Sequence, residues 1–274
     1  MGALYHNLFD SHTHSVNSPD GVHSLMYLAE QAEEKKLIGL AITDHVECLG
    51  FEEQGFRTRL VQSAVDTAKA KEAFRHRMTL AFGIELGVYP GMYETAEYIL
   101  GLYPYDFVVG ACHFSRQGKS LARTDYTALS RDETHKLLSE YFEDMLELAR
   151  WGKFDSLAHI TYPTRWAMKW GLHLSVDPYR EIIDEILRVL VNFQKALEVN
   201  TSGLRGPLEQ TLPPKWVVER YKEMGGELIT IGSDAHNSDY IGHGLSQAME
   251  MLAGVGYKYF AFYRERKPIM LKII

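Results

Sequence analysis

The chain has 274 residues, of which 46% are hydrophobic and 24% are charged. This balance excludes a disordered chain, a coiled coil and a low-complexity scaffold. The 36 acidic residues outnumber the 29 basic ones, and the resulting net charge of −7 argues against a general binder of nucleic acid or of anionic membranes.

Short apolar runs alternate with longer amphipathic segments along the chain. Seven of these runs lack strict alternation, which predicts strands buried on both faces of a parallel sheet. The predicted strands are residues 8–14, 37–45, 78–86, 105–113, 154–159, 196–200 and 227–236. An eighth apolar and aromatic run, 257–263, is a candidate for a further strand.

Helix signals lie between the predicted strands. The spacing of apolar residues predicts a helix over 24–36, and Ser130 with Glu133 forms a capping box that opens a helix running to about residue 150. Pro178 and the pair 213–214 suit the first turns of two more helices. Parallel strands joined by helices form β-α-β units, so the sequence predicts an α/β fold.

The chain shows no boundary and no targeting signal. Because no linker, repeat or charge block divides it, we expect a single domain over residues 1–274. The first residues lack the pattern of a signal peptide, and no apolar run approaches the ~20 residues of a membrane span. Two cysteines, Cys48 and Cys112, favour a reducing, cytoplasmic location. The choice between monomer and homodimer stays open.

Each of the seven predicted strands ends in polar or ionisable residues. In a β/α barrel these ends gather at one mouth, where the active site is built. Six of the 12 histidines lie at five of the seven ends, and burying so many ionisable groups together is costly unless cations compensate. The pattern therefore predicts a polynuclear metal site. The strand-end residues are Asp10, His12, His14, Asp44, His45, Glu85, His113, His159, Asn200, Asp234 and His236.

The spacing within two strand ends supports this interpretation. His12 and His14 are two residues apart, which places both imidazoles on one face of a strand, and the same spacing pairs Asp234 with His236. Nitrogen and oxygen ligands without thiolates favour Zn, Mn or Fe in a hydrolytic site. Surface or structural roles are expected for the other six histidines, which are His6, His23, His76, His135, His173 and His243.

These motifs resemble the polymerase and histidinol phosphatase (PHP) family of metal-dependent phosphoesterases, in the family's order and over essentially the whole chain. The segment Leu197–Arg205 is similar to the subgroup of histidinol-phosphate phosphatases. The resemblance implies an incomplete, TIM-like barrel of seven β/α units with the active site at the C-terminal strand ends. The motifs that carry it surround His12 and His14, Asp20, Asp44 and His45, Glu85, His113, His159, and Asp234 with His236.

The resemblance also implies three metal ions. The first would be held by His12, His14, Glu85 and Asp234. Glu85 would bridge to the second, which His113 and His159 complete. The third would take Asp20, His45 and His236. Some relatives have His where this chain has Asp20, and the family often has Asp where this chain has Thr161.

The implied reaction is hydrolysis of L-histidinol phosphate to L-histidinol and phosphate, a step of histidine biosynthesis. No Ser, Cys or Asp nucleophile motif stands out, so we expect attack by a hydroxide bridging two metal ions. Arg205 and Arg165 follow strands and match phosphate oxygens, and we predict that both bind substrate and assist catalysis. Asp44 is the candidate general acid. Candidates for binding the amine and imidazole are Glu47, Phe51 and Tyr89.

Three other functions remain open on the sequence. One is a PHP-type phosphoesterase acting on nucleotides or nucleic-acid ends, although no basic stripe with interleaved aromatics supports a polymer substrate. Another is a metal-binding regulatory module that has lost activity. The third is a binuclear amidohydrolase barrel, which also opens with His-x-His but usually recruits a strand-borne Lys that this chain lacks.

Overall fold

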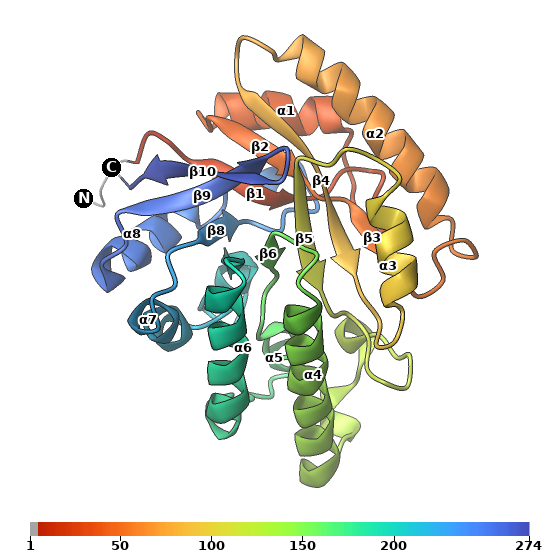
Figure 1. Cartoon of the computed structure of the whole chain (residues 1–274), viewed down its shortest axis with the longest axis vertical. Helices are drawn as coiled ribbons and strands as arrows, with labels where there is room; N and C mark the ends of the chain where they lie inside the picture. The colour runs from red at the N-terminus through yellow and green to blue at the C-terminus, as the bar shows by residue number, and fades with distance from the viewer. Residues whose placement is uncertain (1–4, 274) are drawn as a thin grey trace.

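The computed structural model describes residues 5–273 (Figure 1). Its centre is a sheet of parallel strands in the order β1-β2-β4-β5-β6-β7-β8, with β3 paired to β4. All neighbours in this sheet run parallel, as expected for strands connected by helices. The strands are β1 (Phe9–Thr13), β2 (Gly39–Ile42), β3 (His45–Glu47), β4 (Thr79–Gly87), β5 (Phe107–Ala111), β6 (Ser156–Leu157), β7 (Ala196–Asn200) and β8 (Ile229–Gly232).

The first and last strands of this sheet meet and nearly close it into a barrel. The Asp234 amide donates to the His12 carbonyl at 2.8 Å, and the His14 amide donates to the Ala235 carbonyl at 2.8 Å. β3 continues the line of β2 along β4, so the two short strands occupy one position of the barrel. The predicted incomplete barrel of seven parallel strands is therefore confirmed, with the seven strands at the predicted places.

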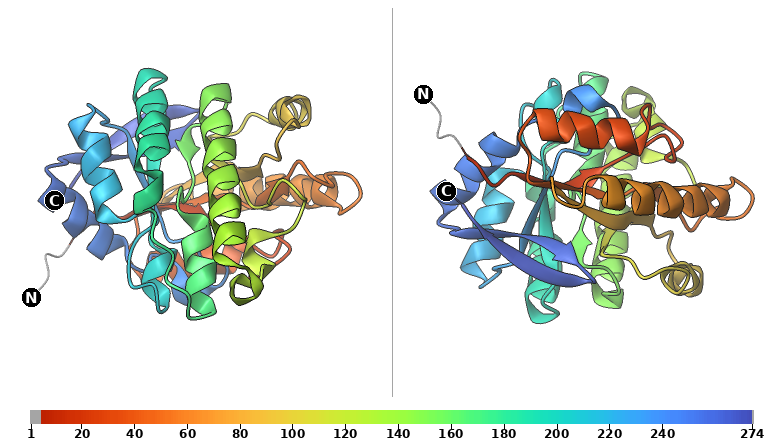
Figure 2. Two further views of the ribbon diagram at one scale, coloured as in Figure 1. Left: turned by 90° about the horizontal axis from the view of Figure 1, so that it is seen from below. Right: turned by 90° about the horizontal axis from the view of Figure 1, so that it is seen from above.

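Helices cover the outside of the barrel, as the views from below and from above show (Figure 2). The long helices α4 and α6 lie side by side on one flank (Figure 1). The helices are α1 (Leu25–Glu34), α2 (Phe56–Ala73), α3 (Tyr93–Leu100), α4 (Arg131–Trp151), α5 (Tyr162–Lys169), α6 (Arg180–Asn192), α7 (Lys215–Glu223) and α8 (Leu245–Val255). Two short 3-10 turns also carry residues used below, η4 (Ser202–Arg205) and η5 (Ser238–Tyr240).

The helix starts follow the predicted signals closely. Ser130 and Glu133 form the capping box at the start of α4, in which each side chain accepts the other's backbone amide. Pro178 lies in a 3-10 turn directly before α6, and Pro214 is the N-cap residue of α7, so both prolines precede their helices by one or two residues instead of lying within them.

The eighth apolar run is a strand, but it does not join the barrel sheet. β9 (Tyr259–Arg264) pairs antiparallel with β10 (Lys267–Lys272) in a separate ribbon. Two residues of the turn between β9 and β10 bond to the barrel. Arg266 donates to Asp155, which directly precedes β6, and the Glu265 amide donates to Asp106, which precedes β5. The ribbon therefore packs against the N-terminal ends of the strands, opposite the end where the predicted site residues lie.

Two smaller predictions also concern the described residues. Cys48 and Cys112 are buried and unpaired, as expected for small apolar residues. Within 5–273, no helix combines the length and apolar character that crossing a membrane requires.

Candidate metal centre

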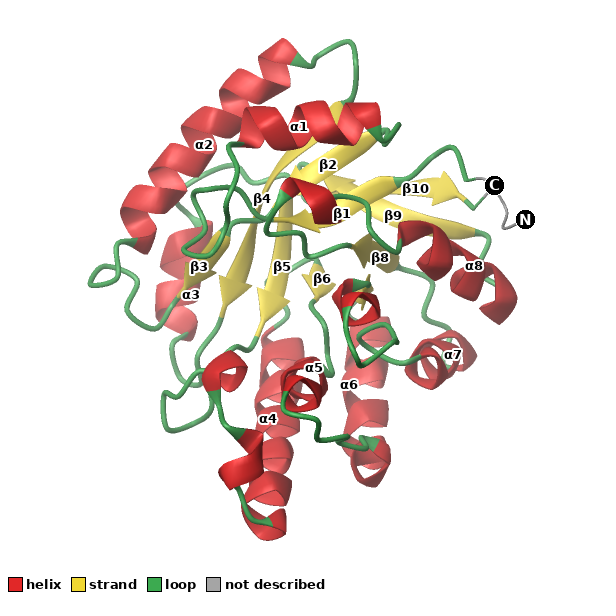
Figure 3. Ribbon diagram, turned by 180° about the vertical axis from the view of Figure 1, so that it is seen from behind, coloured by secondary structure: helices red, strands yellow, loops and turns green. Residues whose placement is uncertain are grey.

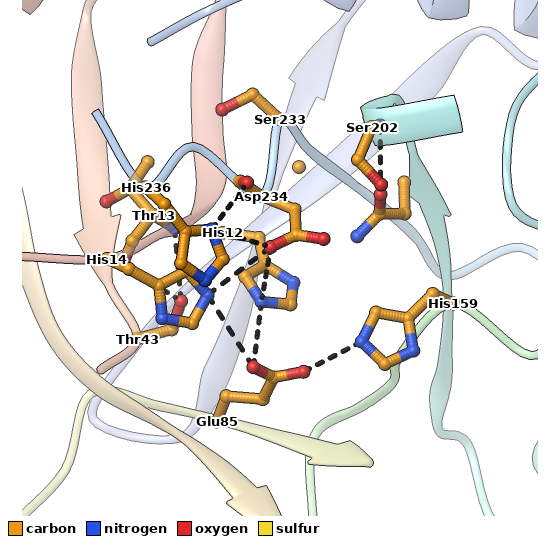
Figure 4. Close-up of polar contacts among 12 residues, drawn as sticks. His12, Thr13, His14, Thr43, Glu85, His159, Ser202, Ser233, Asp234 and His236 are labelled. Atoms are coloured by element: carbon orange, nitrogen blue, oxygen red, sulfur yellow. Dashed lines mark hydrogen bonds and ion pairs between the residues drawn. The ribbon is translucent and has the colours of Figure 1, made fainter. Parts of the chain in front are cut away.

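The C-terminal ends of the strands bring the predicted ligands together at one end of the barrel. Figure 3 shows this end from behind, with the short helices and loops that follow the strands around it. In the close-up, the imidazoles of His12, His14 and His159 point toward the Glu85 carboxylate, and His236 lies beside Asp234 (Figure 4). The residues that meet here are His12, His14, Asp20, His45, Glu85, His113, His159, Asp234 and His236.

The first cluster is fully buried. Nε2 of His12 and Nε2 of His14 lie 3.4 and 3.5 Å from Glu85 Oε2. His14 Nε2 also lies 3.5 Å from Asp234 Oδ1. Ligand atoms about 2.0–2.2 Å from a tetrahedral cation are about 3.3–3.6 Å apart, so these separations are those of atoms that share one ion.

The second cluster uses the other oxygen of the same carboxylate. Glu85 Oε1 lies 3.0 Å from His113 Nε2 and 2.8 Å from His159 Nε2. The carboxylate is buried and its two oxygens face different imidazoles. A glutamate in this position can bridge two cations.

The third cluster is the most exposed. His236 Nε2 lies 3.3 Å from Asp20 Oδ2 and 3.3 Å from His45 Nε2, and His45 Nε2 lies 3.6 Å from Asp20 Oδ1. The Asp20 side chain is 62% exposed, so this cluster faces the solvent. His45 joins it to the other two, because its Nδ1 lies 2.8 Å from Glu85 Oε2.

Buried polar atoms in these clusters lack hydrogen-bond partners among the described residues, although buried polar groups are normally paired. His45 Nδ1 and Glu85 Oε2 face one another without hydrogen-bond geometry. Cations bound between the side chains would satisfy the two Nε2 atoms of His12 and His14 and Oε2 of Glu85, so the donor set fits metal ions. The unsatisfied atoms include His12 Nε2, His14 Nε2, His45 Nδ1 and Glu85 Oε2.

Two of the imidazoles are oriented by carboxylates that contact their Nδ1 atoms. Glu198 Oε1 lies 2.6 Å from His12 Nδ1, and Glu47 Oε1 lies 2.6 Å from His113 Nδ1. A carboxylate can only accept, so each Nδ1 carries the proton and each Nε2 turns a lone pair toward the centre. Glu198 also accepts from the His159 amide at 2.8 Å, which ties a second predicted ligand to the same carboxylate.

His14 is oriented through a hydroxyl. Asp44 Oδ1 accepts from Ser18 Oγ at 2.9 Å, and Ser18 Oγ lies 3.1 Å from His14 Nδ1. Since the Ser18 proton is directed at Asp44, its oxygen accepts from His14, and His14 Nε2 is left as the ligand atom. The Ser18 oxygen also accepts from the His45 amide at 3.0 Å.

The pKa shifts within the cluster indicate that its buried carboxylate is stabilised by positive charge. Burial lowers the pKa of His12, but Glu198 and Glu85 raise it well above its usual range. Burial, together with the neighbouring His236 and His45, holds the pKa of His14 well below its usual range. Burial raises the pKa of Glu85, yet the surrounding imidazoles lower it further, so this carboxyl is ionised. A cation stabilises the same carboxylates that otherwise draw protons onto the histidines.

The clusters form the floor of a cavity of about 330 Å³, which we call the site cavity. Arg165 Nη1 donates to Asp234 Oδ2 at 3.0 Å and to Ser202 Oγ at 2.9 Å. Arg205 donates to the carbonyls of Ser233 and Asp234 at 2.8 and 3.0 Å, and its guanidinium lies 4.7 Å from the centre of the Tyr240 ring. Two fixed guanidinium groups therefore stand beside the clustered ligands, the setting that a phosphate group requires.

A family model described as the PHP domain matches residues 10–202. The chain belongs to the PHP family. A probable histidinol-phosphatase of Clostridium acetobutylicum is 31% identical to it over 92% of this chain and 95% of the relative. A second one, from Thermotoga maritima, is 30% identical over 93% of this chain and 95% of the relative.

The same fold occurs in solved structures. A histidinol phosphate phosphatase from Lactococcus lactis, crystallised with zinc, L-histidinol and phosphate, superimposes with a TM-score of 0.79, covering 96% of this chain and 99% of that one at 21% identity. A putative histidinol phosphatase from Listeria monocytogenes gives a TM-score of 0.71 over 87% of this chain and 99% of that one, also at 21% identity. Both support the PHP-type barrel.

Asp44, the predicted general acid, does not line the site cavity. Its side chain is buried, and its oxygens accept from the amide and hydroxyl of Ser15 at 2.6 and 2.8 Å and from Ser63 Oγ at 2.6 Å, besides Ser18. The four hydrogen bonds engage both oxygens of the carboxylate. This geometry favours a positioning role for Asp44 over the predicted role of general acid.

Three predicted substrate-binding residues also lie outside the site cavity. Glu47 is behind His113, as described above. Phe51 is buried in a different groove, and the Tyr89 hydroxyl donates to the Arg116 carbonyl at 2.7 Å. Glu47 is the last residue of β3, and Phe51 and Tyr89 lie in the loops after β3 and β4.

The sequence interpretation missed several residues of the PHP site. Glu198 was visible as the one charged residue inside an apolar strand, at the period-2 position before Asn200. The others come from α5 and from the segment after His236, and no motif in the sequence marked them. These cavity-lining residues are Tyr162, Trp166, Asn237 and Tyr240.

Proposed function

We propose that this protein is a metal-dependent phosphomonoesterase that hydrolyses L-histidinol phosphate to L-histidinol and phosphate, a step of histidine biosynthesis. The observation that carries the proposal is the site cavity, where three ligand clusters joined by Glu85 lie beside Arg165 and Arg205. Relatives named as histidinol-phosphatases that align over nearly their whole length support the substrate.

We propose three divalent or transition metal ions, of Zn, Mn or Fe, one for each cluster. Bound cations of this kind supply Lewis acidity and an activated water for attack on phosphorus. Nitrogen and oxygen donors without thiolates support this set of metals. The proposed ligands are His12, His14, Glu85 and Asp234 for the first ion, Glu85, His113 and His159 for the second, and Asp20, His45 and His236 for the third.

The two arginines hold the phosphate group in this proposal. Arg165 is anchored by Asp234 and Ser202, and Arg205 by two backbone carbonyls, so neither guanidinium has to be ordered when substrate binds. Their remaining N–H groups can donate to phosphate oxygens, whose charge grows as the bond to the leaving group breaks.

The aromatic wall of the cavity is the proposed place for the histidinol portion. Tyr162 packs 4.7 Å from the His159 ring, measured between ring centres, and Trp166 lies beside it at 5.8 Å. Burial raises the pKa of the Tyr162 phenol well above its usual range, so it remains a hydrogen-bond donor. These flat faces suit the imidazole of the substrate.

The remaining proposals concern the whole chain. We propose that residues 1–274 form one domain, since the β9–β10 ribbon is bonded to residues that precede β5 and β6. A cytoplasmic location is supported by two buried, unpaired cysteines. The acidic net charge supports a small-molecule substrate in preference to a nucleic acid or a membrane partner.

The experiment that tests this function is steady-state phosphate release by protein whose metal content has been measured. The substrates are L-histidinol phosphate, nucleoside monophosphates, a short oligonucleotide and an aryl phosphate. We expect about three metal ions per chain and a kcat/KM for L-histidinol phosphate at least a hundredfold above the others. A nucleotide that is preferred would reassign the substrate, and a metal-loaded protein without any activity would indicate a regulatory module.

A further inference from the structure

A second cavity, of about 210 Å³, adjoins the site cavity between the end of α5 and η4. Arg165, Arg205 and Tyr240 line both cavities, so they form a shared wall. The second cavity adds Lys169, Ser202 and the loop that follows η4. We call it the antechamber.

The antechamber carries an excess of positive charge. Its lining contains three cations, Arg165, Lys169 and Arg205, and no carboxylate. Among residues 5–273, only Arg165 of these three has a carboxylate within 4.0 Å, at Asp234. The other two cationic side chains therefore lack acidic partners, although cationic groups held close together repel one another.

Lys169 is exposed, and its ammonium is held against an aromatic ring at the edge of this group. Its ammonium lies 3.9 Å from the centre of the Trp166 ring. Partial burial lowers its pKa, and so do Arg165 and Arg205. The lysine is thus held near two like charges, an arrangement that an anion would stabilise.

A buried hydroxyl completes the set of donors. Ser202 is 2% exposed, and its oxygen accepts from Arg165 Nη1 at 2.9 Å. Because the oxygen is already an acceptor, the hydroxyl proton remains available to a ligand in the antechamber. The lining thus offers an ammonium, two guanidinium groups and a hydroxyl, which together match a small tetrahedral oxyanion.

We propose that the antechamber is a second anion site that binds inorganic phosphate beside the site cavity. Its phosphate would be the product of the reaction, leaving the metal clusters past Arg165 and Arg205. That source rests on the proposed function, whereas the binding of the anion rests only on the lining residues.

The test is a titration of the metal-loaded protein with inorganic phosphate by calorimetry, together with phosphate inhibition at several substrate concentrations. We expect two binding events and mixed inhibition, whose competitive part reports the site cavity and whose uncompetitive part reports the antechamber. Lys169→Met should weaken the second event and the uncompetitive constant at least about tenfold, because it removes one charge-assisted contact. Turnover without added phosphate should change less than twofold.

Two variants serve as controls. Lys169→Arg keeps the charge and should retain the second event, and Lys69→Met removes an exposed lysine of α2 and should change neither constant. A single binding event with purely competitive inhibition in the wild type would overturn the proposal, and so would a second event that Lys169→Met leaves unchanged. If L-histidinol phosphate is not hydrolysed but the Lys169-dependent event persists, the proposed function fails and the anion site stands.

Discussion

The two ends of the barrel both bury carboxylates, but they surround them with different partners. At the ribbon end, Asp155 accepts from the Val108 amide at 2.8 Å and from Arg266. Asp106 accepts from Lys71 at 2.7 Å and from the amides of Phe82 and Glu265 at 2.9 and 3.1 Å. The protein itself satisfies these charges, and they fix the ribbon in place.

At the opposite end, Glu85 faces His12 and His14, whose Nε2 atoms have no hydrogen-bond partner among the described residues. Here the positive charge has to come from outside the chain. The comparison shows that a buried carboxylate does not by itself indicate a metal site. What distinguishes the two ends is whether groups of the protein neutralise and hydrogen-bond the carboxylate or leave this to a bound cation.

Asp10 and Asp44 lie near the clustered histidines, but their hydrogen bonding resembles that of Asp106 and Asp155 at the ribbon end. Asp10 accepts from the amides of Ser233 and Gly242 at 2.8 and 2.9 Å, and Asp44 accepts from serines and an amide. Both carboxylates are saturated by the chain. They hold the loops that carry the ligands and do not contact the substrate cavity.

Among the substitutions that distinguish the two ends, Glu85→Gln is expected to have the largest effect. The variant removes the carboxylate shared by the clusters, so kcat/KM should fall by roughly a thousandfold or more, since charge stabilisation by the cations is worth several kcal/mol. Metal analysis should show fewer ions per chain. A full metal complement with normal turnover would contradict the bridging role.

Arg205→Ala should have a smaller effect. Losing one charged hydrogen bond to phosphate costs about 1.5–3 kcal/mol, which corresponds to a decrease in kcat/KM of about one to two powers of ten. Metal content should not change. An unchanged kcat/KM for L-histidinol phosphate would remove Arg205 from the site.

Asp44→Asn distinguishes a positioning residue from a general acid. Since Asp44 acts through Ser18 on His14, we expect kcat/KM to fall about tenfold for alkyl and aryl phosphates alike. A general acid matters most for a poor leaving group, so a loss confined to the alkyl ester would restore the original assignment.

Asp155→Asn should leave the chemistry unchanged and alter stability. It weakens the charged contact with Arg266, so Tm should fall by roughly 3–8 °C. The metal content and kcat of the folded protein should match the wild type. A loss of bound metal would show that the ends are coupled, against the comparison drawn above.

Much of the fold, and the convergence of the strand-end residues, could be predicted because both follow from local patterns. Apolar runs without alternation identify strands of a parallel sheet, and the barrel then brings their ends together whatever their separation in sequence. His12 and His14 needed only the period of a strand to be placed on one face. These inferences do not depend on side-chain packing.

The residues that escaped prediction depend on partners far away in the chain. Glu198 orients His12, although 186 positions separate them. Asp44 follows a strand like the ligands do, but Ser15, Ser18 and Ser63 occupy its oxygens. The position after a strand predicts where a side chain lies, whereas its neighbours decide what it does.

The pairing of β1 with the segment after β8 has a consequence for the order of events during synthesis. His12 is synthesised 222 residues before Asp234. The first cluster therefore cannot assemble until almost the whole barrel has left the ribosome and its first and last strands have met. Because metal binding at such a site is coupled to folding, an ion held by the first cluster marks a barrel whose first and last strands have met.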